Sequence, residues 1–162
     1  MTTVLLNRRG LLAAGGSVLA TGVAGFILPA AAQSLTPTVT MRGGSNNYRA
    51  GAPIVERIGR GGFWMTGTVR RAGDGAPLAG QRIQVWAHTT EGYEDNTKSH
   101  GATLSDANGV FRLEMPQIVP AFGQAHGHLA FDSGGYETVF LRPLLASAKA
   151  TSLEAHFVLK PV

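Results

Sequence analysis

The chain of 162 residues contains no cysteine. This absence excludes a disulfide-stabilised scaffold, a thiolate metal site and a cysteine nucleophile. Charged residues make up only 15% of the sequence, whereas 22 glycines and 8 prolines are present. Few charges combined with many turn-forming residues argue against a coiled coil, a helical bundle and a disordered acidic tail. The same composition favours many short strands that are joined by tight turns.

The chain also has little excess charge of either sign. Its formal net charge is +4, and this falls to +2 without Arg8 and Arg9, which lie in a segment that we expect to be removed. The remaining arginines are scattered along the sequence rather than clustered. Nucleic-acid-binding domains need a dense basic surface, so we expect no nucleic-acid partner.

The first 32 residues have the features of an export signal. Arg8 and Arg9 precede an apolar run over residues 11–28 that is diluted by four glycines, and three alanines at positions 30–32 form a small-x-small cleavage site. The alternative is a membrane anchor, because about 18 apolar residues can just span a bilayer. The glycines weaken that alternative, and the small residues suit a peptidase. We therefore predict a twin-arginine signal that is removed, export to the periplasm or the extracellular space, and no stable membrane anchor afterwards.

The mature chain, residues 33–162, is long enough to bury one hydrophobic core. Short alternating or apolar stretches recur along it, and Gly, Pro, Asp and Asn residues separate them. The expected strands are Phe63 to Val69, Gln81 to Trp86, Val110 to Leu113, His126 to Phe131, Thr138 to Leu141 and Leu153 to Leu159. The sequence therefore predicts an all-β fold, a single antiparallel β-sandwich of six to nine strands. The expected core residues are Ile83, Val85, Phe111, Leu113, Leu129 and Phe157.

Two histidines separated by one residue, His126 and His128, are candidate metal ligands. Side chains at i and i+2 of a strand point to the same face, about 6.5 Å apart. Two imidazoles on one face suit iron, copper or zinc. The alternative is a pair of exposed polar residues on the solvent side of an edge strand. Tyr93, which follows a strand, is either a ligand or a rim residue, and His100 is a candidate further ligand or a partner of a ligand.

Six short motifs follow one another along the mature chain. They are G-T-V at 67–69, Q-V-W at 84–86, E-G-Y at 91–93, T-L-S-D-A-N-G at 103–109, H-G-H-L at 126–129 and G-Y-E-T at 135–138. Each resembles a motif of the intradiol ring-cleavage dioxygenases, the catechol and protocatechuate dioxygenase family. The counterparts in that family are G-x-V, E-V-W, G-x-Y, T-L-T-D-x-D-G, H-I/V-H-F and G-Y-E-T. The motifs occur in family order, and the resemblance extends over roughly residues 35–160.

The resemblance implies a ferric iron site, because two tyrosines and two histidines hold Fe(III) in this family. Tyr93, His126 and His128 would then be ligands and catalytic residues. The implied substrates are a small aromatic diol and O₂, and the ring opens between its hydroxyl-bearing carbons to give a diacid. The family's second tyrosine has no counterpart before His126, and Gly123 stands where the family has an arginine. The proton acceptor for the second hydroxyl stays open between His100, Tyr48 and a hydroxide on the metal.

Two other interpretations use the same residues. Motifs at 67–69, 77–80 and 106–109 also occur in carboxypeptidase-regulatory-like and transthyretin-like β-sandwich modules, which would need no convergence of Tyr93, His126 and His128. An exported copper or zinc protein would use the two histidines, with His100 as a further ligand. Assembly into a homo-oligomer is compatible with the sequence.

Overall fold

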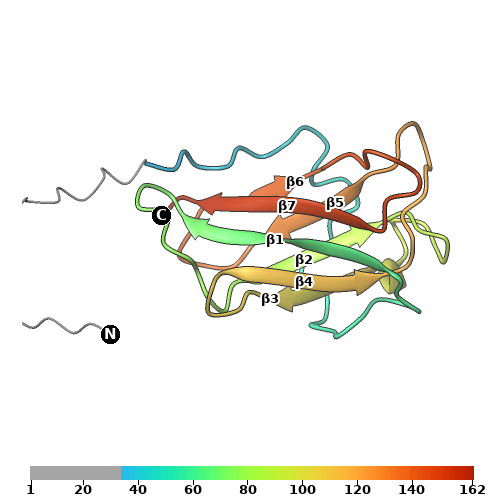
Figure 1. Ribbon diagram of the computed structural model, residues 1–162, viewed down its shortest axis with the longest axis horizontal. Helices are drawn as coiled ribbons and strands as arrows, with labels where there is room; N and C mark the ends of the chain where they lie inside the picture. Colours follow the sequence, from blue (N-terminus) through green and yellow to red (C-terminus); the bar gives the residue numbers. More distant parts are fainter. Residues whose placement is uncertain (1–33) are drawn as a thin grey trace, which may run out of the picture. The chain divides into compact units, whose positions relative to one another are not determined.

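The structure, a computed structural model, describes residues 34–162 and shows two β-sheets packed face to face (Figure 1). The expected signal over residues 1–32 lies outside the described residues. One sheet has the strand order β4-β1-β7 and is built from β1 (Phe63–Arg71), β4 (Val110–Met115) and β7 (Ser152–Leu159). The other has the order β3-β2-β5-β6 and is built from β2 (Arg82–Ala87), β3 (His100–Leu104), β5 (Gly127–Phe131) and β6 (Val139–Leu141).

The predicted all-β sandwich is confirmed, with seven strands in the described part of the chain. The strands pair antiparallel except for β1 and β7, which run parallel in the same sheet. The short 3₁₀ turn η1 (Thr97–Ser99) precedes β3. Within residues 34–162, no helix has the length and hydropathy that a membrane span requires.

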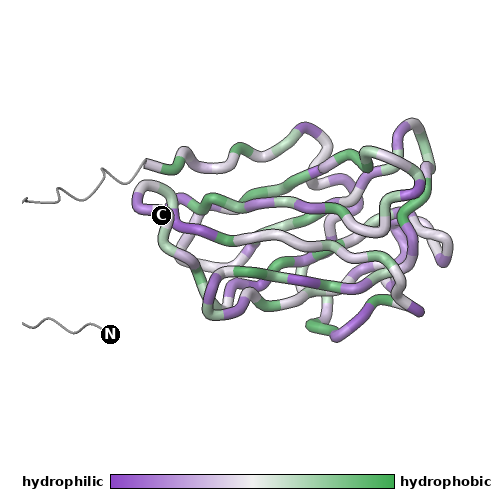
Figure 2. The backbone as a smooth tube through the Cα atoms, viewed as in Figure 1, coloured by the Kyte–Doolittle hydropathy of each residue, from purple (hydrophilic) through white to green (hydrophobic). Residues whose placement is uncertain are grey.

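Alternating side chains of both sheets form the core between them. Every second residue of β1 from Phe63 to Val69 is buried, and β7 alternates between buried residues and residues that are exposed or partly exposed. Figure 2 shows this alternation as hydrophobic and hydrophilic segments along the front sheet. The core residues predicted from the sequence are confirmed, because none of them is more than 1% exposed: Ile83, Val85, Phe111, Leu113, Leu129 and Phe157.

The outer face of the second sheet is covered by the segment over residues 41–55, and this cover shapes the functional site. The indole Nε1–H of Trp86 donates to the carbonyl oxygen of Asn46 at 2.9 Å. The side-chain amide of Gln84 donates to the carbonyl of Arg49 at 2.7 Å. Consequently β2 and β5 are buried on both faces, although their outward side chains include Gln84, Trp86 and His128.

Tyr48 attaches this covering segment to the sheet, which leads to a testable pH dependence. Its phenol donates to Asp132 Oδ2, and Asp132 also pairs with Arg82 at 3.1 Å. Burial, and then the bond to the Asp132 carboxylate, raises the pKa of Tyr48 to about 12. Because folding favours the neutral phenol, this contribution to stability is fully present below the ordinary tyrosine pKa of about 10 and is lost as pH rises through about 12.

We therefore expect one of the three tyrosines to ionise only near pH 12 in an ultraviolet titration of the folded protein. Tyr48→Phe should remove this late step and leave the others in place. A late step that persists in Tyr48→Phe would contradict the assignment.

Candidate metal centre

The pairing of β2 with β5 brings two distant parts of the chain to the same end of the sandwich. The strands are antiparallel, and Ala87 at the end of β2 lies opposite Gly127 at the start of β5. The loop over residues 88–99 follows β2 and is tied down by backbone bonds. Val119 N–H donates to His88 O at 3.1 Å, and Thr90 N–H donates to the carbonyl of Gln117 at 3.0 Å. Residues of this loop therefore lie beside the H-G-H motif.

His126 and His128 point to the same face, as their i, i+2 spacing predicts. Their ring centroids are 5.0 Å apart. Gly127 between them faces the core, where a Cβ atom would lie only 2.8 Å from Met65 Cε. His126 is 7% exposed and His128 is fully buried, and β5 lies between β2 and β6. This placement excludes the alternative of an exposed pair on an edge strand.

Glu94 completes a group of three candidate ligands with the two histidines. Its Oε2 atom lies 3.5 Å from His126 Nε2 and 3.3 Å from His128 Nε2. One ligand atom from each residue lies within 4.8 Å of the others. The Oε1 atom of the same carboxylate accepts a bond from Asn47 Nδ2 at 2.8 Å. Asn47 therefore fixes the carboxylate so that Oε2 faces the imidazoles.

The hydrogen bonds of the two Nδ1 atoms, on the ring edges that point away from Glu94, indicate the tautomer of each imidazole. His126 Nδ1 lies 2.8 Å from the carbonyl oxygen of Gln124, and His128 Nδ1 lies 3.0 Å from that of Gly44. A carbonyl oxygen only accepts, so Nδ1 of His128 carries the hydrogen. At His126 the 2.8 Å contact with the Gln124 carbonyl favours the same tautomer over the longer, 3.3 Å contact with the donor Nη2 of Arg142. Burial lowers the pKa of His128, which favours its neutral form. Its Nε2 lone pair then points at the carboxylate.

This arrangement fits a metal ion. His128 Nε2 and Glu94 Oε2 are both buried and have no hydrogen-bond partner. At 3.3 Å, Nε2 and Oε2 repel each other unless a metal ion lies between them or the imidazole carries a second proton and donates it to the carboxylate. Burial, which lowers the pKa of His128, disfavours the second proton. An ion about 2.1 Å from each ligand would separate ligand atoms by about 3.0–3.4 Å. The observed separations are therefore close to those of a metal centre.

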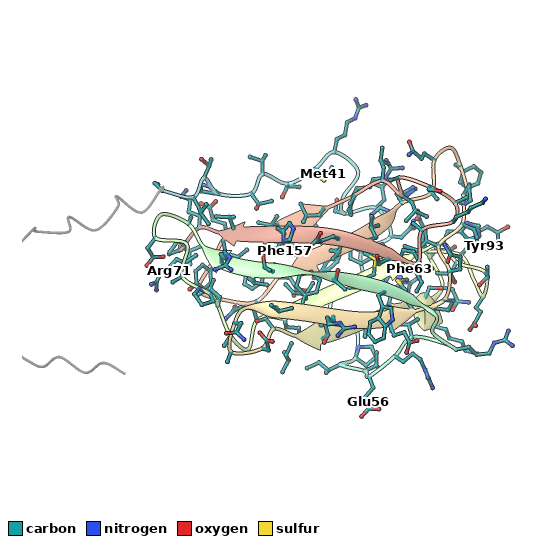
Figure 3. The ribbon with its side chains drawn as sticks, viewed as in Figure 1. Met41, Glu56, Phe63, Arg71, Tyr93 and Phe157 are labelled. Atoms are coloured by element: carbon teal, nitrogen blue, oxygen red, sulfur yellow. The ribbon has the colours of Figure 1, made fainter. Side chains whose placement is uncertain are left out.

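The structure places Tyr93 and His100 differently from these three residues. Tyr93 is 62% exposed, its ring stacks on His88 with centroids 4.6 Å apart, and it lies beyond the strand ends at the right of Figure 3. His100 Nε2 lies 2.7 Å from the carbonyl oxygen of Glu94, so it donates there and supports the loop. Burial lowers the pKa of His100. Direct ligation by Tyr93 or His100 stays a prediction.

Sequence reasoning missed Glu94, although a signal for it was present. The family's G-x-Y pattern has its tyrosine two residues after the glycine, and counting from Gly92 gives Glu94 rather than Tyr93. Tyr93, the ligand that the resemblance implies, lies one position before the place that this spacing gives. Gly123, which replaces the family's arginine, has φ +90°, a backbone conformation that side-chain-bearing residues rarely adopt.

An open cleft of about 440 Å³ lies beside the centre and shares Glu94 with it. Two aromatic side chains in its lining are strongly exposed, Tyr93 at 62% and Phe122 at 89%. The full lining consists of Asn47, Tyr93, Glu94, Asp95, Ala121 and Phe122. A flat organic molecule could therefore reach the edge of the candidate metal centre.

Comparison with known proteins shows similarity in structure. No family model matches the chain, and no curated protein matches its sequence. The fold is similar to hydroxyquinol 1,2-dioxygenase from Pseudomonas putida DLL-E4, with TM-score 0.61, 16% identity and coverage of 80% of this chain and 68% of that one. It is also similar to 3-chlorocatechol 1,2-dioxygenase from Rhodococcus opacus 1CP, with TM-score 0.60 and 18% identity. That match covers 82% of this chain and 76% of the other.

A third similar structure is the dioxygenase domain of a dioxygenase–carbohydrate-binding fusion from Streptomyces sp. SirexAA-E. Its TM-score is 0.57 at 12% identity, and the match covers 81% of this chain and 99% of that domain. The resemblance inferred from the sequence motifs is thus confirmed for the fold. This chain has the β-sandwich of the intradiol dioxygenases, in a divergent form.

Proposed function

We propose that this chain is an exported iron-binding oxygenase that opens a catecholic ring with O₂. The observation that carries the proposal is the convergence of the buried His126 and His128 imidazoles on one carboxylate, beside a cleft with exposed aromatic walls. The likeness to enzymes that act on hydroxyquinol and 3-chlorocatechol supports an aromatic diol as the substrate class. One diol and one O₂ would give one diacid, so no external reductant is consumed.

The iron would be held by His126, His128 and an anionic side chain from the loop over residues 88–99. When bound, iron supplies a Lewis acid and a template for the two diol oxygens and O₂. The ferric state expected from the sequence depends on Tyr93, because a phenolate is a hard anionic donor that favours Fe(III). The loop also carries Glu94, whose carboxylate already faces both imidazoles.

The chain's own residues orient the substrate and the ligands. Tyr93 and Phe122 offer exposed rings on which an aromatic diol can pack. His100 donates to the Glu94 carbonyl and so fixes the backbone of the ligand-bearing loop. The Tyr48 phenol donates to Asp132 Oδ2, and its pKa is raised to about 12, which disfavours its phenolate as the proton acceptor at neutral pH.

A zinc or copper protein is the second candidate function. Two histidines and one glutamate are a set that zinc enzymes use, which favours this candidate on the observed side chains. A metal-free binding module is less well supported, because it would leave the buried Nε2 of His128 and Oε2 of Glu94 without partners. Metal identity separates these functions.

The test is metal analysis and oxygen uptake on the full chain purified from the exported fraction. We expect about one iron per chain, and O₂ consumption with catechol or hydroxyquinol that yields a diacid in equal amount. Zinc or copper in place of iron would support the second candidate. Protein without metal, which also fails to take up added Fe²⁺ or Zn²⁺, would contradict a metal centre altogether.

Export is proposed from the first 32 residues and has its own test. Replacing Arg8 and Arg9 together by lysine should trap the precursor inside the cell, because twin-arginine transport depends on both arginines. The wild-type protein should appear outside the cytoplasm with an N-terminus near Gln33, as N-terminal sequencing would show. Unchanged export of the double-lysine variant would exclude the twin-arginine route.

A further inference from the structure

The Glu94 carboxylate faces two buried imidazoles through an oxygen, Oε2, that has no hydrogen-bond partner. We propose that Glu94, and not Tyr93, is the third protein ligand, so that the centre is a two-histidine, one-carboxylate site for a divalent first-row metal ion. This inference deepens the proposed function and rests on its metal centre at His126 and His128. It replaces the phenolate ligand with a carboxylate and thereby changes the charge state of the ion that the site prefers.

The first argument is the direction of the Glu94 carboxylate. Its Oε1 is held by Asn47 at 2.8 Å, whereas Oε2 faces the two Nε2 atoms at 3.3 and 3.5 Å without a hydrogen bond. Because the nearer partner of each Nδ1 is a backbone carbonyl, the favoured tautomers direct the Nε2 lone pairs inward. Three electron-pair donors that meet in a buried space define a cation site.

The second argument is the rigidity of the backbone that presents Glu94. His100 Nε2 donates to the Glu94 carbonyl at 2.7 Å. On the preceding residue, the Tyr93 carbonyl accepts the N–H of Asn96 at 3.1 Å. The loop is therefore fixed on both sides of the Glu94 side chain, and metal ligands are commonly held by such outer hydrogen bonds.

The third argument is that Tyr93 and Glu94 point in different directions. The Tyr93 ring lies against His88, with an interplanar angle of 6°, and 62% of the residue is exposed. Turning its phenol toward the histidines would break this stack and displace the neighbouring Glu94. A carboxylate with two imidazoles is the donor set of non-haem Fe(II) oxygenases, and it also binds zinc. We expect such a site to favour divalent ions and to lack a phenolate-to-iron absorption band.

The test compares two neighbouring substitutions in the full chain, Glu94→Gln and Tyr93→Phe. Protein stripped of metal by a chelator is titrated with Zn²⁺, and with Fe²⁺ under anaerobic conditions. Glu94→Gln should weaken both affinities by at least about 100-fold, beyond the roughly 10–100-fold that losing a ligand's hydrogen-bond partner costs. Tyr93→Phe should change them by less than about threefold, since removing an exposed hydroxyl leaves a ligand set of Glu94, His126 and His128 intact.

Thermal unfolding of the metal-free variants shows whether each variant is folded. Independently, the absorption spectrum of the iron-loaded wild type should have no phenolate-to-iron charge-transfer band in the visible range. Loss of metal in Tyr93→Phe with retention in Glu94→Gln would overturn the Glu94 assignment while leaving the metal centre in place. A visible band that Tyr93→Phe bleaches would also overturn it. If the protein binds metal through Glu94 but takes up no O₂, Glu94 is supported as the third ligand and the oxygenase function is refuted. If the wild type binds no metal, both the Glu94 ligand and the oxygenase function are refuted.

Discussion

Replacing His126 or His128 by alanine should remove most of the bound metal. The free energy of binding at a four-ligand structural zinc site is about 10–16 kcal/mol, or about 3 kcal/mol per ligand. Loss of one imidazole should therefore weaken binding by about 100-fold or more. Equilibrium titration with Zn²⁺ and metal content after dialysis both measure this loss.

His156→Ala is the matched control, because His156 lies on β7 in the other sheet and half of its side chain is exposed. It should retain the wild-type affinity. His128 is fully buried and bonded to Gly44, so its alanine variant loses packing as well as a ligand. His126 lies just before β5, and its variant therefore tests ligation with less effect on the fold. Wild-type metal retention in both variants would refute the site.

The strands of the three-stranded sheet were predictable because their patterns are local. In β1 and β7, one face packs against the core and the other meets solvent, so the sequence alternates with period two. The strand β3 was not expected, because Gly101 interrupts the sequence H-G-A-T-L. Its pairing with β2 is a long-range contact that no local pattern reveals.

The covering segment over residues 41–55 was also beyond sequence reasoning. It has no strand or helix periodicity, yet its backbone carbonyls bind Gln84, Trp86 and His128. Gly44 allows this close approach, because a Cβ atom there would lie 2.8 Å from the carbonyl oxygen of Phe140. The burial of the outer face of β2 and β5 follows from this cover rather than from the strands themselves.

The candidate site was predictable only where its geometry is local. His126 and His128 share a face because they are two residues apart on an extended chain. Glu94 joins them through the path of a loop, and that path depends on its bonds to Gln117 and Val119 in a different loop. The family resemblance favoured Tyr93 as the ligand, although the loop turns its side chain outward.

Trp86→Ala should give the largest loss of stability among single substitutions around the site, about 3–5 kcal/mol in the free energy of unfolding. Trp86 is fully buried on the covered face of β2. Its ring stacks against His100 on β3 and His128 on β5, with centroids 5.6 and 5.2 Å apart. Truncation would leave a cavity between the two histidines and an unpaired carbonyl on Asn46. Denaturant unfolding of the metal-free protein measures the change.

Trp64→Ala is the matched control, because Trp64 is only half-buried, and the guanidinium of Arg112 lies over its ring at 4.6 Å. Trp64→Ala should lower the free energy of unfolding much less than Trp86→Ala does.

Trp86→Phe retains an aromatic ring but loses the hydrogen bond to the Asn46 carbonyl. The loss of this bond alone should lower the free energy of unfolding by about 1–2 kcal/mol. Zn²⁺ affinity should fall in Trp86→Ala, since this ring supports both the candidate ligand His128 and His100, which holds the Glu94 backbone. Equal losses in Trp86→Ala and Trp64→Ala, with unchanged Zn²⁺ affinity in both, would show that the stack does not support the metal centre.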